Sequence, residues 1–438
     1  MTYESIKSII LTILVGASLL LTWSLWTYQP NYEELENGET VQEVSFSPKK
    51  ALKDIVKPDQ ILYHSEDGFH GTFREEEIEK VINAISQWHM TGFENLALEG
   101  SNVYSLIDNQ EAVEILYPSE IAINLYKNVL GIKEKDIPNF HFNQIVIPLN
   151  IEQREHGVIY FVSNEEKRVY RSMIPFSLIS EFKGHYFEAA KAYSKYFPYT
   201  TTSGRRIYLP EGETEMLSYQ HLSSELDSDK FKDALFNDPS LVQKNYTATG
   251  VEYTDASSLM RVNTDINTIS YIDPSELANQ ELDTNNLLKR SIDFVNGHGG
   301  WTDNYRFVGM DKEQHMVHFR LYGQDGYPIF SENTAIAKIR LIWGNTDINR
   351  YIRSNFSLGL LTSTSPRKLD SGAVVLEKIQ KINQFNPNLL ENIKIGYDMK
   401  MNDQSLLIQL EPSWYYLYNG VWKQLKTSEY GGEVHGLE

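Results

Sequence analysis

The segment near the amino terminus restricts the fold of this chain more than any other feature. Ser8–Tyr32 contains no charged residue, and Ile9–Trp26 within it is strongly apolar. A helix needs about 20 such residues to cross a membrane, whereas the apolar part of an export signal needs only about 7–15. The run ends in aromatic residues that include Trp23 and Trp26, and it lacks the small-residue cleavage pattern of an export signal. We therefore predict a retained transmembrane helix over residues 8–30.

The charges on either side of this helix predict its orientation. Lys7 and the amino terminus precede the helix, and the next positive residue is Lys49. Positive residues favour the cytoplasmic side of a membrane, so we expect residues 1–7 to be cytoplasmic. Residues 31–46 are acidic and poor in apolar residues, which predicts a stalk. The bulk of the chain is then extracytoplasmic and attached to the cell membrane by a single pass.

The predicted helix also carries a candidate contact surface. Ser8, Thr12 and Gly16 recur every four residues, and such a row of small side chains lets a second membrane helix approach closely. Trp23 and Trp26 are typical of the membrane–water interface. We name these five residues as the predicted partner-contact site. The alternative is a passive tether whose small residues face lipid.

Beyond the stalk, the alternation of apolar and polar residues predicts an α+β fold with antiparallel sheets. Breaks that carry Pro, Gly and Thr suggest three domains, over residues 47–198, 199–332 and 333–438. In the first, "REEEIEKVINAISQW" has helical spacing, and "AVEILYP", "QIVIPL", "GVIYFVS" and "RVYRSMI" are typical of strands. We also predict a helix that starts at Pro48, capped by Ser47 and stopped by Pro58. Further helices are expected over 119–130 and 179–197.

Two later stretches share an order of elements. Each begins with a helical pattern, "LLKRSIDFVNG" or "AVVLEKIQKINQF", and continues as a hairpin with a polar tip, which suggests two related α+β units. The first contains "GHGGW", Gly297–Trp301, which is similar to an esterase oxyanion turn. The chain has no G-x-S-x-G nucleophile motif, so we interpret this turn as a helix end. Gly297 is then expected to be left-handed and Trp301 to be buried.

Composition excludes several functions. The formal net charge is −19, and no run of Lys or Arg exceeds two residues, so we expect no nucleic-acid binding. The chain has no cysteine, which excludes disulfides and thiolate metal sites. His315 and His318 are three apart, and on a strand they would point to opposite faces, which is a poor metal site. We predict no metal, no cofactor and no catalytic residues.

Two other functions remain open as alternatives. Ser47-x-x-Lys50 and Ser365-x-x-Lys368 match the first motif of penicillin-binding enzymes, although Ser47 is explained as a cap and Ser365 precedes a proline in a predicted loop. An exported wall-active hydrolase or transpeptidase is therefore one alternative. Aromatic residues make up 12% of the chain and cluster in "SWYYLYNGVW", so a sensor that binds a wall fragment is another.

The stretch "LTWSLWTYQPNYE" at Leu21–Glu33 and the later "DGYPIF" resemble the YycH family. Its members regulate the YycG/YycF (WalK/WalR) two-component system of Gram-positive bacteria, which governs cell-wall homeostasis. The resemblance covers the whole chain and implies a three-domain extracytoplasmic body on one membrane helix. It also implies signal transduction without catalysis: the protein would modulate a sensor histidine kinase, together with a YycI-like partner, through contacts among transmembrane helices.

Overall fold

A computed structural model divides the chain into two compact units, residues 1–43 and 44–438. It describes residues 14–18, 44–45, 47–96, 104, 107–108, 110–149, 156–277, 284–402 and 406–426. In the first unit, residues 14–18 are helical, and the rest of the predicted membrane span lies outside the described residues. None of the helices described is both long and apolar enough to cross a membrane. The predicted span over residues 8–30 stays a prediction.

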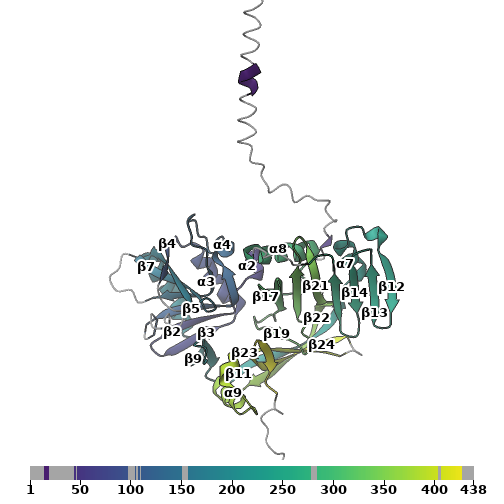
Figure 1. The fold of residues 1–438 in the computed structure, drawn as a ribbon. Helices are drawn as coiled ribbons and strands as arrows, with labels where there is room; N and C mark the ends of the chain where they lie inside the picture. The colour runs from purple at the N-terminus through teal and green to yellow at the C-terminus, as the bar shows by residue number, and fades with distance from the viewer. Residues whose placement is uncertain are drawn as a thin grey trace, which may run out of the picture. The chain divides into compact units, whose positions relative to one another are not determined.

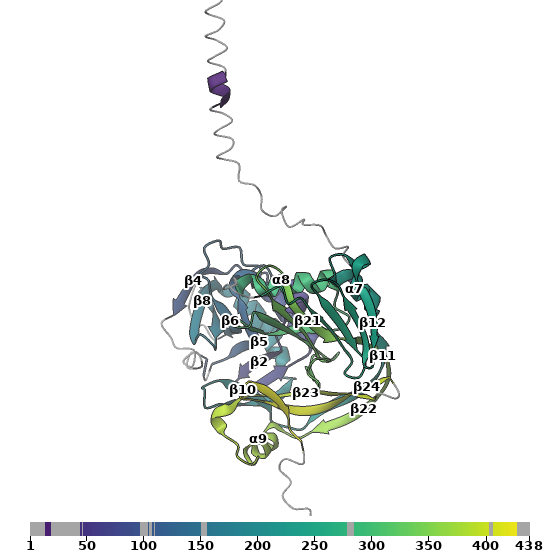
Figure 2. The same ribbon diagram turned by 45° about the vertical axis from the view of Figure 1, so that its right-hand side comes forward.

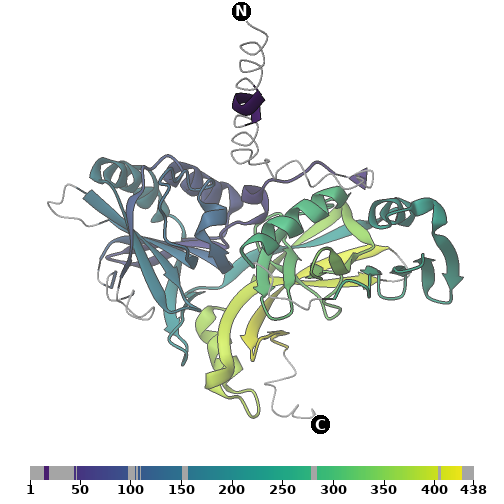
Figure 3. The same ribbon diagram turned by 45° about the horizontal axis from the view of Figure 1, so that its top comes forward.

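The second unit contains a nine-stranded antiparallel sheet in the order β10-β9-β3-β2-β5-β6-β7-β8-β4. Its strands are β2 (Gln60–Ser65), β3 (Gly68–Thr72), β4 (Thr91–Leu96), β5 (Ala112–Ala122), β6 (His141–Pro148), β7 (His156–Ser163), β8 (Arg168–Pro175), β9 (Ser194–Thr200) and β10 (Arg206–Pro210). Figure 3 shows helices of this region lying over the sheet. They are α3 (Glu75–Ile85), α4 (Ile123–Tyr126), α5 (Phe176–Phe182), a π-helical turn (Lys183–Phe187) and α6 (Glu188–Ala190). The helical spacing predicted for α3 is confirmed, because Ile78, Val81 and Ile85 are buried.

An eight-stranded antiparallel sheet runs in the order β12-β13-β14-β15-β21-β20-β18-β17. Its strands are β12 (Gln243–Thr247), β13 (Gly250–Thr254), β14 (Leu259–Asn263), β15 (Thr268–Ile272), β17 (Tyr305–Asp311), β18 (Met316–Leu321), β20 (Lys338–Trp343) and β21 (Ile348–Ser354). The helices α7 (Ser228–Leu235) and α8 (Thr284–Gly297) accompany it (Figure 1), and a 3₁₀ turn spans Pro239–Leu241. Along β20, Ile339, Leu341 and Trp343 are buried, while the alternate side chains are half-buried. The sheet therefore has one core face and one partly open face.

A third sheet contains the longest strands (Figure 2), in the order β19-β23-β24-β11-β22 with β25 against β24. They are β11 (Thr214–Glu225), β19 (Ile329–Phe330), β22 (Phe356–Leu369), β23 (Leu390–Asn402), β24 (Leu407–Tyr418) and β25 (Val421–Gln424), with α9 (Gly372–Gln380) and a 3₁₀ turn (Pro387–Leu389) before β23. Within this sheet, as far as the structure describes it, β19 and β23 pair in parallel and the other pairs are antiparallel. The predicted helix-then-hairpin order is present twice, as α8-β17-β18 and α9-β23-β24, but the two hairpins belong to different sheets.

The hydrogen-bonded sheets divide the chain at other points than the predicted domains. The boundary between residues 198 and 199 falls inside β9, and β10 extends the first sheet beyond it. The boundary at 332 separates β18 from its partner β20, while β11 joins strands more than a hundred residues later. The backbone N–H and C=O groups at a sheet edge need hydrogen-bond partners. An open edge therefore pairs with whichever strand of the chain lies beside it. The three-domain division as independent folding units stays a prediction.

Three predicted helix bounds are wrong. The first helix, α2, spans Leu52–Ile55 rather than starting at Pro48. The stretch expected to be helical from 119 begins as strand, because Ile121 pairs with Phe142 of β6, and only α4 follows. The helix expected over 179–197 ends at Ala190, since the next residues pair within the first sheet. In the last two cases strand pairing overrides local helix propensity.

The end of α8 differs from its prediction in one detail. Gly297 is the last helical residue, and the left-handed residues are Gly299 (φ 91°) and Gly300 (φ 70°). Gly300 N–H donates to the carbonyl of Val295 at 2.8 Å, which closes the helix end. Trp301 is buried, as predicted. The interpretation as a helix end is confirmed, and the residue assigned to the left-handed position is corrected.

This difference gives a stability prediction. A Cβ added to Gly299 would lie 2.2 Å from Cε1 of Phe231 at a positive φ, whereas a Cβ on Gly297 would meet nothing within 4 Å. We expect Gly299→Ala to lower the free energy of unfolding by about 1–3 kcal/mol, and Gly297→Ala to be neutral or slightly stabilising. Denaturant midpoints of the full chain in detergent measure both. The reverse ranking would contradict the structure.

Candidate functional site

The predicted partner-contact site is described only at one position. Ser8, Thr12, Trp23 and Trp26 lie outside the described residues. Gly16 lies in the helical segment 14–18, and a Cβ added there would meet nothing within 4 Å. The contact surface as a whole stays a prediction.

The second unit begins with a short anchored strand. β1 (Val44–Ser45) pairs in parallel with β16 (His298–Gly299), directly after the end of α8. Lys50 continues the attachment. Its backbone N–H donates to Oδ1 of Asn296 at 2.9 Å, its carbonyl accepts from Nδ2 of Asn296 at 3.0 Å, and its ammonium donates to the carbonyl of Asp303 at 2.9 Å. The chain that leaves residue 43 is therefore fastened first to the α8–β16 corner.

Asn296 connects this attachment to the core of the eight-stranded sheet. Its Oδ1 also accepts from the indole N–H of Trp301 at 2.8 Å. The Trp301 ring lies edge-on to Phe319 of β18, with ring centroids 4.9 Å apart. Both ends of the buried amide thus have partners, as a buried polar group requires. A displacement of the attachment would have to move Asn296 and, with it, the core of this sheet.

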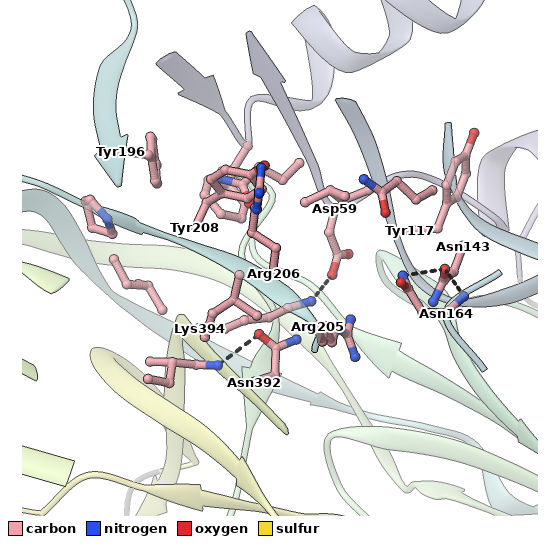
Figure 4. Close-up of a pocket in the computed structure, with 18 of the residues that line it drawn as sticks. Asp59, Tyr117, Asn143, Asn164, Tyr196, Arg205, Arg206, Tyr208, Asn392 and Lys394 are labelled. Atoms are coloured by element: carbon pink, nitrogen blue, oxygen red, sulfur yellow. Dashed lines mark hydrogen bonds and ion pairs between the residues drawn. The ribbon is translucent and has the colours of Figure 1, made fainter. Parts of the chain in front are cut away.

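Asp59, one residue before β2, joins three parts of the second unit. Its carboxylate accepts from the hydroxyl of Tyr322 at 2.7 Å and forms an ion pair with Lys394 of β23. Figure 4 shows the Asp59 and Lys394 side chains pointing toward each other. Asp59 is 5% exposed. Burial, followed by the charge of Asp59, raises the pKa of Tyr322 well above its usual range, so this phenol stays a hydrogen-bond donor.

A second buried charge lies beside this contact. Arg306 of β17 is 1% exposed and donates to Oε2 of Glu75 at 2.7 Å. Its guanidinium lies over the Tyr322 ring, 4.5 Å from the centroid. Glu75 is the first residue of α3, where a helix end favours a negative charge, and it also pairs with Lys57. Burial opposes ionisation of Glu75, but Arg306 and Lys57 hold its pKa below the usual value.

A small cavity lies next to Asp59, between the first sheet and β23 (Figure 4). Asn143, Arg206, Tyr208 and Lys394 are among its lining residues. Its volume is about 60 Å³, which is room for a few water molecules. Small-molecule sites are usually several times larger. This cavity is therefore a gap at the contact between the first sheet and β23, which we call the seam, and it does not suit a substrate.

One buried acid cluster next to this seam has the residue types of a catalytic site. Glu114 is fully buried, lies 2.7 Å from Nε2 of His64, and accepts from the Tyr208 hydroxyl and from Nε2 of Gln144, each at 2.5 Å. These partners come from β2, β10 and β6, so the carboxylate links strands across the sheet. Both of its oxygens are occupied, and the neighbouring cavity holds only water-sized molecules. The cluster therefore fits a structural role.

The penicillin-binding motifs are not assembled into a site. Ser365 was expected in a loop, and this prediction is wrong. It lies in β22, where its hydroxyl is 2.7 Å from that of Ser218 on β11. Lys50 is engaged at the α8 corner. Lys426, whose "KTS" nearly matches the K-T-G motif of these enzymes, pairs with Glu332. The wall-enzyme alternative thus gains no support from its own motif residues.

The two histidines considered for a metal are also separated by the fold. His315 has φ 50° and lies in the turn before β18, whereas His318 lies within that strand. His315 therefore belongs to the turn, and His318 to a strand, of the same β17–β18 hairpin. The described part of the chain contains no group of three or more His, Cys, Asp or Glu side chains that could hold a metal ion.

The chain matches two family models, "YycH protein, N-terminal domain" over residues 4–183 and "YycH protein, C-terminal domain" over residues 204–431. A curated relative from Bacillus subtilis (strain 168), the "two-component system WalR/WalK regulatory protein YycH", is 25% identical over 441 residues and 96% of each chain is covered. The crystal structure of YycH from Bacillus subtilis is similar, with a TM-score of 0.74 at 20% identity, over 87% of this chain and 99% of that one. The apolar amino-terminal segment lies inside the matched region.

The Glu75–Arg306 contact makes a prediction about the seam. Glu75→Gln leaves a buried guanidinium without its charged partner, so we expect it to lower the free energy of unfolding by about 1–3 kcal/mol. Glu79→Gln is the matched control, because Glu79 lies one turn further along α3, also pairs with Lys57, and has a side chain that is 54% exposed. We expect it to change stability by less than about 0.5 kcal/mol. Equal losses, measured by denaturant unfolding, would contradict a special role for Arg306.

Proposed function

This chain belongs to the YycH family, and we propose that it is a regulator of a sensor histidine kinase of the WalK type. The observation that carries the proposal is the match to the family over both halves of the chain, together with the name of the curated relative. That relative is named as a regulatory protein, in agreement with the predicted non-enzymatic role. The regulated pathway would be a WalR/WalK-type two-component system.

The proposed arrangement has one membrane helix over residues 8–30, a cytoplasmic amino terminus and an extracytoplasmic body. The charge-free run Ser8–Tyr32 and the placement of Lys7 support it. The membrane helix then contacts helices of the kinase and of a YycI-like companion. A partner can shift the kinase between signalling states only if it binds one state more tightly than the other. A difference of about 1–3 kcal/mol would change output by about 5–150-fold.

The contact row Ser8, Thr12 and Gly16 is the proposed source of that difference. Close approach of two helices depends on small side chains at the crossing, and a Cβ added to Gly16 would meet no described atom within 4 Å outside its own helix backbone. The body would control the helix through the stalk. Any partner that acts on the body reaches the membrane segment along the chain before Val44, which is fastened at β16.

A chimera tests where the regulatory activity resides. Residues 1–35 fused to an unrelated exported domain should retain most of the effect on kinase output, because the helix contacts are preserved. Output is measured with a transcriptional reporter of the response regulator, and membrane insertion is checked by fractionation. Complete loss of the effect in a normally inserted chimera would remove the helix as the functional surface.

A substitution on the row tests the contact itself. Gly16→Leu should weaken the association between this chain and the kinase by about fivefold or more in a bacterial two-hybrid assay, because leucine keeps two helices apart. Ala17→Leu is the control, since it places the same leucine side chain one residue off the row. Equal effects of the two substitutions would assign the contact to another face.

A further inference from the structure

One face of the eight-stranded sheet carries a row of positive side chains. Arg306 of β17 lies directly opposite Arg320 of β18, and Arg320 lies directly opposite Lys338 of β20. His318 and Arg340 form the neighbouring cross-strand pair, two residues along and therefore on the same face. Like charges directly opposite on a sheet are destabilising. This row therefore needs an explanation other than stability.

Among the residues that the structure describes, Arg306 alone in this row has a carboxylate partner. Arg306 is paired with Glu75, as described above. Arg320 is 5% exposed; its guanidinium donates to the carbonyl of Ile329 at 3.1 Å and lies over the Phe330 ring, 4.0 Å from the centroid. Within the described residues, neither Arg320 nor Lys338 has an ion pair, and the Lys338 ammonium has no hydrogen bond either. Among these residues, two buried or half-buried cations thus remain without anions.

Arg320 and Lys338 line the same cavity, which we call the basic cavity. Its volume is about 470 Å³, a size typical of small-molecule sites. Phe330, Tyr415 and Trp422 form part of its wall, with Phe330 stacked on Tyr415 at 4.0 Å between centroids. The two acids of its lining already have partners of their own, Glu332 with Lys426 and Asp398 with Lys400.

The pKa values of these groups agree with an excess of positive charge. Burial, together with Arg320 and Arg340, lowers the pKa of Lys338 to about 7. Burial lowers the pKa of Arg320 to about 10, and burial with the charges of Lys338, Arg340 and Arg320 lowers that of His318 to about 4. For Arg320 and Lys338, which line the basic cavity, burial makes the protonated form less favourable than it is in water, and a nearby anion would stabilise it.

We propose that the basic cavity binds a small ligand through a phosphate monoester group, held by Arg320 and Lys338. A phosphate monoester carries close to two negative charges at neutral pH and so matches two unpaired cations, whereas a carboxylate carries one. Arginine offers a planar fork of donors to phosphate oxygens, and lysine offers a compact charge. The aromatic wall at Phe330 and Trp422 suits the organic part of the ligand. The site does not depend on the membrane helix.

The test uses the full chain in detergent and three probes. These are inorganic phosphate, glycerol 1-phosphate, and phosphatidylcholine vesicles with or without phosphatidic acid. We expect phosphate to raise the melting temperature more than sodium chloride at equal ionic strength, and glycerol 1-phosphate to bind in calorimetry. Binding of the two soluble probes identifies a soluble ligand, and binding only to phosphatidic acid vesicles identifies a lipid headgroup. No response to any probe overturns the proposal.

Matched lysine substitutions assign the binding to this cavity. Lys338→Gln should weaken phosphate and glycerol 1-phosphate binding by about tenfold or more, and Lys338→Arg should largely restore it. Lys381→Gln is the control, because it removes the same charge from an exposed i,i+4 pair next to α9. Lys338→Gln should also raise the melting temperature without ligand, since it relieves repulsion from Arg320. Undiminished binding in a folded Lys338→Gln, or equal loss in Lys381→Gln, overturns the assignment.

Discussion

The carboxylate of Asp59 is the contact on which the arrangement of the second unit depends. Its partners, Tyr322 and Lys394, lie 263 and 335 residues further along the chain, and Arg306 stacks on the same tyrosine while it binds Glu75. Buried charges are costly unless each has its counterpart, so the groups must meet in one geometry or leave an unpaired ion. Apolar side chains can shift slightly against each other and stay in contact. These hydrogen-bonded ion pairs weaken when their distances or angles change. They therefore fix how three sheets meet.

The local pattern of the sequence predicted much of this fold, and the pairing of distant strands could not be read from it. Apolar spacing located α3 and most strands, and the helix-then-hairpin order was visible twice. The strand at Ile121 and the extension of the first sheet by β10 depend on which edge lies nearby, which no local pattern records. The clustering of positive charges in the fold is likewise not visible in the local sequence. No Lys/Arg run marks the row of Arg306, Arg320 and Lys338, because each comes from a different strand.

The eight-stranded sheet combines two features. Its core face holds Trp301 and Phe319 and, through Asn296, the attachment of the chain that follows the predicted membrane segment. Its other face holds the basic cavity, and His318 and Arg320 flank Phe319 on β18. The proposed ligand site and the attachment thus lie on opposite faces of the same strand. The predicted contact row at Ser8, Thr12 and Gly16 belongs to the part of the chain that precedes this attachment.

The parallel pairing of β1 with β16 has a mechanical consequence. Only two residues form this strand, and a pull on the chain before Val44 acts first on their few bonds to β16. Tension would therefore peel β1 away first and transfer the force to Lys50 and its bonds to Asn296. The chain would lengthen by a short step while the larger sheets of the second unit keep their pairing. A pull is in this way converted into a discrete change at one corner of this unit.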